Sequence, residues 1–86
     1  MKIAAAGSLE SNDCYITVKE SNDLQIEINS IVFDQFGNQI RKVIHDTLEE
    51  LQITKIYVQC NDKGALDYTI KARLLTAIAR MRGIHA

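Results

Sequence analysis

The residues best suited to chemistry lie in the tetrapeptide Glu-Ser-Asn-Asp, which occurs at residues 10–13 and again at residues 20–23. Each copy places one primary hydroxyl, that of Ser11 or Ser21, close to two carboxylates. Both copies lie between segments that resemble strands, and Ser, Asn and Asp favour turns because their side chains bond to the nearby backbone. The simplest interpretation is that both copies are hairpin turns. The question is whether one of them is also a chemical site.

The sequence supplies no group that would activate either serine as a nucleophile. It has no G-x-S-x-G elbow, Gly-rich phosphate loop, H-E-x-x-H or C-x-x-C motif, and its two histidines are not in a triad order. Glu10 and Asp13 would disfavour an alkoxide on Ser11. We therefore predict no catalytic residue, and we interpret His45 as a solvent-side residue of a helix.

The cysteines and histidines do not suggest a metal site. Structural zinc takes about four Cys or His ligands in close pairs, whereas Cys14 and Cys60 stand alone and His45 and His85 are far apart. Each cysteine alternates with apolar residues, so we interpret both as small apolar strand residues. No metal and no disulfide scaffold are expected.

Charged side chains in the second half of the chain are most simply surface residues. Glu49 and Glu50 fit a solvated helix face. Four basic residues on or near one predicted helix could bind phosphate or an acidic surface, but we favour solubilising charge that also compensates the helix dipole. These residues are Lys71, Arg73, Arg80 and Arg82.

Alternation of apolar and polar residues predicts the strands. It is clear in CYITVK (14–19), LQIEINS (24–30) and KIYVQC (55–60), each with one buried face. The segment KIAAAGSL (2–9) is a weaker strand candidate, which would make the first tetrapeptide a hairpin turn. The second tetrapeptide is predicted to join strands 14–19 and 24–30 in another hairpin.

Spacings of three and four predict two helices. The first has the stripe Phe33, Phe36, Ile40, Val43, Ile44, Thr47, Leu48 and Leu51. Gly37 within it costs about 1 kcal/mol relative to Ala, so the helix begins later or something packs closely there. The second runs from about Ala65 to a C-cap at Gly83, with Leu66, Ile70, Leu74, Ala77, Ile78 and Met81 inward. The expected N-caps are Asn29 or Ser30 and Asn61 or Asp62.

This order of elements predicts an α+β two-layer sandwich of one domain, residues 1–86. A small mixed sheet of three to four strands would carry two helices on one face. The helix between the last two strands is a crossover, so those strands should be parallel, whereas the opening hairpins should be antiparallel.

The charge and hydropathy of the sequence limit the kinds of partner that the protein is expected to bind. Ten basic and eleven acidic residues give a net charge of −1, and no basic cluster alternates with aromatics, so nucleic acid is not favoured. No stretch approaches the roughly 18 apolar residues of a membrane span. The opening MKIAAAGSLES is too soon interrupted by polar residues for a signal peptide. We expect a cytoplasmic module without a membrane partner.

Three segments resemble the acyl carrier protein of citrate lyase, its gamma subunit. They are AGSLESND (6–13), QFGNQI (35–40) and NDKGALDYTIKARLLTAIARMRG (61–83), in the family's order over almost the whole chain. A Leu-Glu-Ser turn combined with a downstream Asp-Lys-Gly-Ala-Leu-Asp is specific. Family members carry a further short tail after the position of RGI.

The resemblance implies that Ser11 carries a prosthetic group derived from 2'-(5''-triphosphoribosyl)-3'-dephospho-CoA, joined through a phosphodiester by a separate transferase. The terminal thiol of this arm would carry acetyl and citryl groups between the alpha subunit, which transfers the acyl group, and the beta subunit, which cleaves the citryl thioester. The carrier itself would catalyse nothing. The segment DKGALD (62–67) is either a docking surface or a structural helix start.

Two alternatives remain open. The carrier of malonate decarboxylase uses the same type of arm, and the substrate is not written in this chain. A small α+β interaction or RNA-binding module would have no arm.

Overall fold

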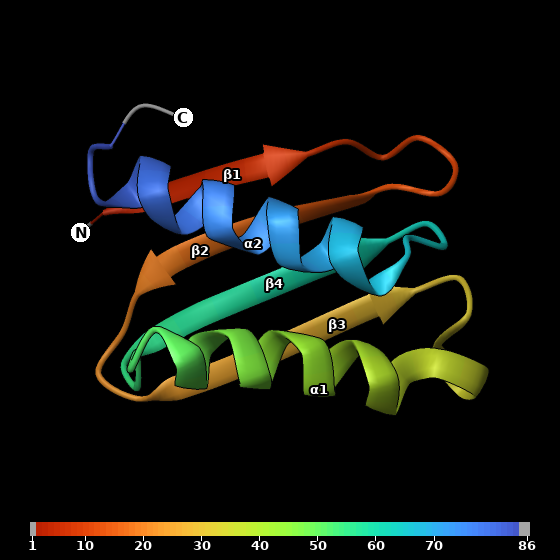
Figure 1. The fold of residues 1–86 in the computed structure, drawn as a ribbon, viewed down its shortest axis with the longest axis horizontal. Helices are drawn as coiled ribbons and strands as arrows, with labels where there is room; N and C mark the ends of the chain where they lie inside the picture. Colours follow the sequence, from red (N-terminus) through yellow and green to blue (C-terminus); the bar gives the residue numbers. More distant parts are fainter. Residues whose placement is uncertain (1, 85–86) are drawn as a thin grey trace.

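One mixed sheet with two helices on one face forms the structure, a computed structural model that describes residues 2–84 (Figure 1). The elements are β1 (Ile3–Gly7), β2 (Cys14–Glu20), β3 (Leu24–Ser30), α1 (Phe33–Glu50), β4 (Ile56–Asp62) and α2 (Asp67–Met81). The predicted α+β two-layer sandwich is confirmed, and the weak first strand is present at one edge of the sheet.

The strand order is β1-β2-β4-β3. The β1–β2 hairpin is antiparallel and β3 pairs with β4 in parallel, as predicted. The predicted hairpin of β2 with β3 is wrong, because β4 lies between them and pairs with both. Turn residues favour a reversal of chain direction, but they do not specify which strand becomes the neighbour.

The second tetrapeptide therefore crosses the start of β4 instead of closing a hairpin. Glu20, Ile56 and Leu24 lie side by side in the register of the three strands. Residues 21–23 thus span two strand spacings of about 4.8 Å each. Asp23 fastens this crossing, because its carbonyl accepts the Ile56 N–H at 3.1 Å.

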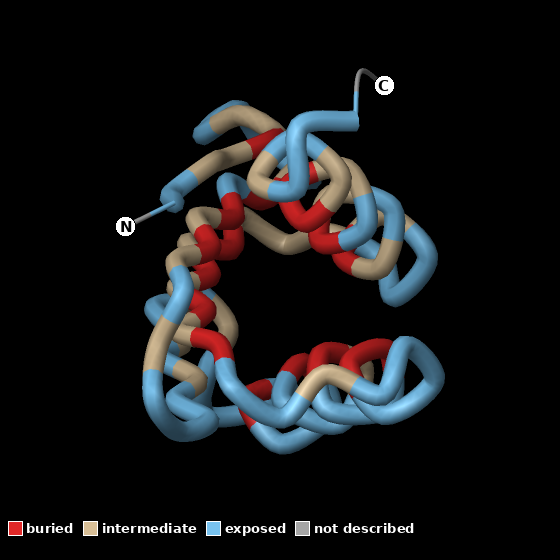
Figure 2. The backbone as a smooth tube through the Cα atoms, turned by 90° about the vertical axis from the view of Figure 1, so that its left-hand side faces the viewer, coloured by how far each residue is buried: buried red, intermediate tan, exposed pale blue. Residues whose placement is uncertain are grey.

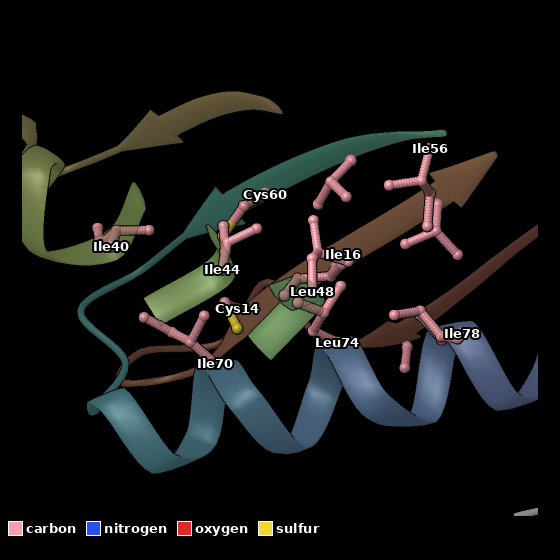
Figure 3. Close-up of a cluster of buried hydrophobic side chains, with 14 residues drawn as sticks. Cys14, Ile16, Ile40, Ile44, Leu48, Ile56, Cys60, Ile70, Leu74 and Ile78 are labelled. Carbon is pink, nitrogen blue, oxygen red and sulfur yellow. The ribbon is translucent and has the colours of Figure 1, made fainter. Parts of the chain in front are cut away.

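The core lies between the sheet and the two helices, where the buried segments face one another (Figure 2). Helix α1 packs against β3 and α2, while α2 packs against β1 and β2. Figure 3 shows side chains from both helices meeting those of β2 and β4. The largest buried apolar residues are Ile16, Val18, Ile44, Leu48, Ile56, Val58, Ile70 and Leu74.

The predicted apolar stripe of α1 is buried only in the middle of the helix. Ile40, Ile44 and Leu48 are in the core, but Phe33 and Phe36 are 46% and 51% exposed, and Leu51 is exposed after the helix end. The first turn of α1 projects past the end of β3, where the sheet no longer covers it (Figure 1). The expected close contact at Gly37 is present, since a Cβ there would lie 2.7 Å from the Phe33 ring.

Neither helix begins at a predicted cap. The N-cap residues are Val32 and Leu66, without a side-chain cap, and α2 begins slightly later than expected. The prediction that Leu66 faces inward is wrong, because it precedes the helix and is 57% exposed. Ser30 instead donates its hydroxyl to the buried Asp62 carboxylate at 2.7 Å and accepts the Val32 N–H at 3.1 Å. The Asp62 carboxylate also accepts the N–H groups of the loop before α2. These side chains join loops to each other instead of capping helices.

Glycines stand where the backbone needs positive φ. Gly83 ends α2 as predicted, with φ 80° and bonds from Gly83 N to Arg80 O at 3.0 Å and from Ile84 N to Ala79 O at 2.8 Å. This is a Schellman motif. Gly7 ends β1 with φ 105°, and its Cα faces the Cys14 carbonyl so closely that a Cβ would overlap it.

Gly7→Ala should therefore destabilise the protein by more than about 2 kcal/mol, because the strain of positive φ adds to a backbone clash. Gly83→Ala is the matched control, since its φ is also positive but nothing lies within 4 Å of a Cβ there. We expect it to cost only about 1 kcal/mol. Urea denaturation of both variants measures the difference, and equal losses would contradict this account of Gly7.

Candidate functional site

The first tetrapeptide lies in the loop of residues 8–13 between β1 and β2, at the end of the sheet where the β3–α1 and β4–α2 loops also lie (Figure 1). Ser8 N donates to Cys14 O at 3.1 Å, and Asp13 N donates to Glu10 O at 3.2 Å. Asn12 has φ 65°, a conformation that Asn tolerates better than most residues. The predicted turn at this position is confirmed.

This loop is also bonded to the segment that follows β4. Asn12 N donates to Lys63 O at 2.8 Å, and Lys63 N donates to Asp13 O at 2.9 Å. These bonds continue the β2–β4 ladder beyond the pair of Cys14 with Asp62. The backbone on one side of Ser11 is therefore held to the centre of the sheet.

The Asp13 carboxylate holds the same loop to α2. It accepts two hydrogen bonds from Arg73, from Nε at 3.0 Å and Nη2 at 2.9 Å, and one from the Ser8 hydroxyl at 2.6 Å. The Cys14 N–H donates a fourth at 2.7 Å. The Arg73 hydrogen bonds, followed by that of Ser8, lower the pKa of Asp13 from 3.8 to about 2. The same pair raises the pKa of Arg73.

Ser11 is exposed at the tip of this loop. Its hydroxyl takes part in none of the hydrogen bonds just described, so it is held in place by its neighbours while its oxygen stays accessible to solvent. Leu9, Glu10 and Asn12 beside it are exposed too. The arrangement presents a primary hydroxyl at a defined position with room for a bulky substituent.

The serine of the second copy is used differently. Ser21 is half-buried and donates its hydroxyl to Asp23 Oδ1 at 3.1 Å, while its oxygen lies 3.5 Å from the Asp23 N–H. Asp23 also accepts a bond from Gln25 at 3.1 Å. The Ser21 hydroxyl therefore stabilises its own turn, so the two copies of the tetrapeptide do not do the same job.

The cysteines are buried, as predicted, in neighbouring strands. Hydrogen bonding with Cys14 and burial both raise the pKa of Cys60. His45 is exposed on α1, with Asp46 and Glu49 at 3.9 and 3.7 Å. His85 lies outside the described residues. Within residues 2–84 no group of three or more potential ligands gathers to hold a metal ion.

Among the predicted surface charges, Arg73 has a role that sequence reasoning missed. Lys71 and Glu50 form an exposed pair at 3.0 Å, and Arg80 donates to the Ala5 carbonyl at 3.0 Å. Arg73 instead reaches across to Asp13, 60 residues earlier in the chain. No local pattern marks such a pair, because its members meet only after α2 packs on β1 and β2.

Neither helix in the described part of the chain is long and apolar enough to cross a membrane.

Comparisons with known proteins place this arrangement in a class. Residues 1–81 match the family model described as "Malonate decarboxylase delta subunit (MdcD)". The fold resembles a chain of a Pseudomonas malonate decarboxylase hetero-tetramer determined in complex with malonate. The TM-score is 0.79 over 93% of this chain and 84% of that one, at 17% identity. The fold and the matched model define a small acyl carrier subunit.

Curated relatives make the assignment more specific. The citrate lyase acyl carrier protein of Halothermothrix orenii is 49% identical over 92% of this chain and 85% of its own length. That of Streptococcus uberis is 48% identical over 98% of this chain and 84% of its own length. The chain therefore belongs to the family of citrate lyase acyl carrier proteins, as its sequence motifs indicated.

The Asp13–Arg73 pair makes stability depend on pH. Because folding lowers the pKa of Asp13 from 3.8 to about 2, its contribution is present above about pH 4 and is lost as the pH falls toward 2. Arg73 is partly exposed, so we expect only about 1–2 kcal/mol. Asp13→Asn should lose this contribution at neutral pH and show a shallower fall in stability between pH 4 and pH 2.

Asp46→Asn is the control for this experiment, because it removes an exposed ion pair with Lys42 that water screens. Its stability should follow that of the parent across the same pH range. Urea denaturation at several pH values measures both variants. Identical pH profiles for the parent and Asp13→Asn would show that the pair does not stabilise the loop.

Cys14 lies three residues after Ser11 but is fully buried, so it should be inert as an acyl-bearing thiol. In the native protein we expect a thiol reagent to label Cys14 far more slowly than it labels a short peptide containing residues 10–18. Denatured protein should lose this protection. Labelling of the native protein at the peptide's rate would contradict the packing of β2.

Proposed function

We propose that the chain is the acyl carrier subunit of a citrate lyase and that Ser11 holds its prosthetic group, phosphoribosyl dephospho-coenzyme A, through a phosphodiester. One observation carries the choice of serine. The Ser11 hydroxyl is exposed and uncommitted on a loop whose neighbouring groups are bonded, whereas the Ser21 hydroxyl bonds to Asp23. The family assignment supports the carrier role.

The surroundings of Ser11 fit an attached group of this kind. A phosphodiester needs a primary hydroxyl that a second protein can reach, and Ser11 lies among exposed residues with space around it. The neighbouring carboxylates of Glu10 and Asp13 disfavour an alkoxide on Ser11, so the attaching transferase must supply the activation. The group, once bound, supplies a thiol on which acyl groups can be carried as thioesters.

The chain's own residues hold the loop of Ser11 in place. Asp13 connects the loop to α2 through Arg73, and Lys63 connects it to β4, so the Ser11 oxygen has a defined place on the carrier. Anchoring at one such point makes each encounter with a partner's active site intramolecular and raises the effective concentration. The proposed partners are the alpha and beta subunits of citrate lyase, which would supply the catalytic groups, in the cytoplasm.

The malonate decarboxylase carrier remains the second candidate, because the matched family model is described as a malonate decarboxylase subunit and the similar solved chain belongs to a malonate decarboxylase hetero-tetramer. Identity near one half to citrate lyase carriers, against 17% to the malonate decarboxylase chain, favours citrate. Reconstitution of the loaded chain with the alpha and beta subunits of each complex distinguishes the two. Restored turnover of malonate but not of citrate would reverse the assignment.

Replacing each serine tests the attachment site. In the native host, Ser11→Ala should abolish loading and citrate turnover by the reconstituted complex, because alanine has no oxygen to form the bond. Ser21→Ala is the matched control and should keep both near the parent level. Ser11→Ala should alter stability by no more than about 0.5 kcal/mol, and Ser21→Ala, which loses the bond to Asp23, by about 1 kcal/mol at most.

Intact mass, citrate turnover and urea denaturation are measured for both variants beside the parent. Loading retained in Ser11→Ala, or lost in folded Ser21→Ala, would show that the wrong copy of the tetrapeptide is assigned.

A further inference from the structure

A groove of about 620 Å³ lies between the first turns of α1 and α2, at the same end of the molecule as Ser11. Val32, Phe36 and Ile40 line it from the α1 side. Ala65, Leu66 and Tyr68 line it from the α2 side. Gln39 donates to the Asp67 carboxylate at 2.7 Å and so joins the two helices beside it. A cavity of this size and mainly apolar lining is typical of a small-molecule site.

The groove is better suited to an uncharged ligand than to an ion. Its buried acid, Asp62, already accepts bonds from the Ser30 hydroxyl and from the N–H groups of Gly64 and Ala65. No buried side-chain polar atom within residues 2–84 lacks a partner. The one exposed carboxylate of the lining, Asp67, accepts the bond from Gln39. What it does offer is apolar surface, with Phe36, Leu66 and Tyr68 each more than half exposed.

The wall of the groove adjoins the loop that carries Ser11. Lys63 is bonded through its backbone to Asn12 and Asp13, and the next residue, Gly64, lines the groove. A Cβ on Gly64 would lie 3.6 Å from the Asn12 side-chain oxygen. Ser11 is therefore separated from the groove by one residue on its own loop and by the short segment 63–65.

We infer that this groove receives the pantetheine portion of the arm on Ser11 while the arm is not engaged with a partner subunit. This inference rests on the proposed function. The pantetheine portion is uncharged and combines methyl-bearing carbon with two amides, which suits apolar walls edged by Tyr68, Gln39 and Asp67. Tethering gives an effective concentration in the millimolar range, so weak affinity is sufficient for occupancy.

Chemical shifts in the loaded and unloaded protein test the groove directly. Loading should shift the signals of Phe36, Ala65 and Tyr68 as well as those of residues 9–13. The crossing at residues 21–23 lies at the other end of the sheet and should not change. Shifts confined to residues 9–13 would show an arm that extends into solvent, leaving the groove for an apolar side chain of a partner, and would overturn the inference.

Reactivity of the arm thiol provides a second readout. Both cysteines of the chain are buried, so a thiol reagent reports on the arm in the native protein. We expect it to react at least about twofold more slowly than free dephospho-coenzyme A, because the bound fraction is protected. Phe36→Ala should restore the free rate. Phe33→Ala is the matched control, since Phe33 is a similarly exposed neighbour that does not line the groove.

Failure of this inference is distinguishable from failure of the proposed function. Intact mass and peptide mapping show whether Ser11 is loaded, and a chain without the arm on Ser11 contradicts the proposed function. The groove is then judged by adding free dephospho-coenzyme A to the unloaded chain. Shifts of Ala65 and Tyr68 that Phe36→Ala abolishes support the groove, and unchanged spectra at millimolar ligand overturn it.

Discussion

Strand β4 pairs with a neighbour on each side, and the residues at its C-terminal end meet all three loops at that end of the sheet. Asp62 binds the Ser30 hydroxyl before α1 and the N–H groups that lead into α2. Lys63 exchanges backbone bonds with Asn12 and Asp13 in the loop of Ser11. Because β4 is a central strand, these bonds attach all three loops to the middle of the sheet. The positions of both helix starts and of the serine therefore depend on β4.

The repeated tetrapeptide shows how context divides identical residues between two roles. In the first copy Asp13 is bound by Arg73 and Ser8, which leaves the Ser11 hydroxyl uncommitted. In the second copy Asp23 accepts a bond from Gln25, and the hydroxyl of Ser21 donates to the same carboxylate oxygen. The bonding of the aspartate determines whether the serine hydroxyl of each copy is free. A carboxylate beside a guanidinium and a second hydroxyl has its acceptor sites filled.

Local patterns in the sequence predicted most of the secondary structure and the broad fold, because alternation and helical spacing depend on residues close together in the chain. They also indicated that Cys14 and Cys60 are apolar strand residues, and at Gly37 they left open a later helix start or a close contact. The motifs of the sequence indicated the carrier family. Through this family resemblance they singled out Ser11, whereas side-chain chemistry alone left the two copies of the tetrapeptide equivalent.

Only the tertiary structure decided which groups meet across long stretches of chain. It placed β4 between β2 and β3, joined Arg73 to Asp13, and turned Ser30 and Asp62 from expected helix caps into partners of each other. Helical spacing had assigned Phe36 to the core, but the structure exposes its side chain beside a groove. The physical reason is the same in each case. Periodicity records which face of an element is apolar, whereas strand neighbours, ion pairs and the limits of the core depend on how the elements pack together.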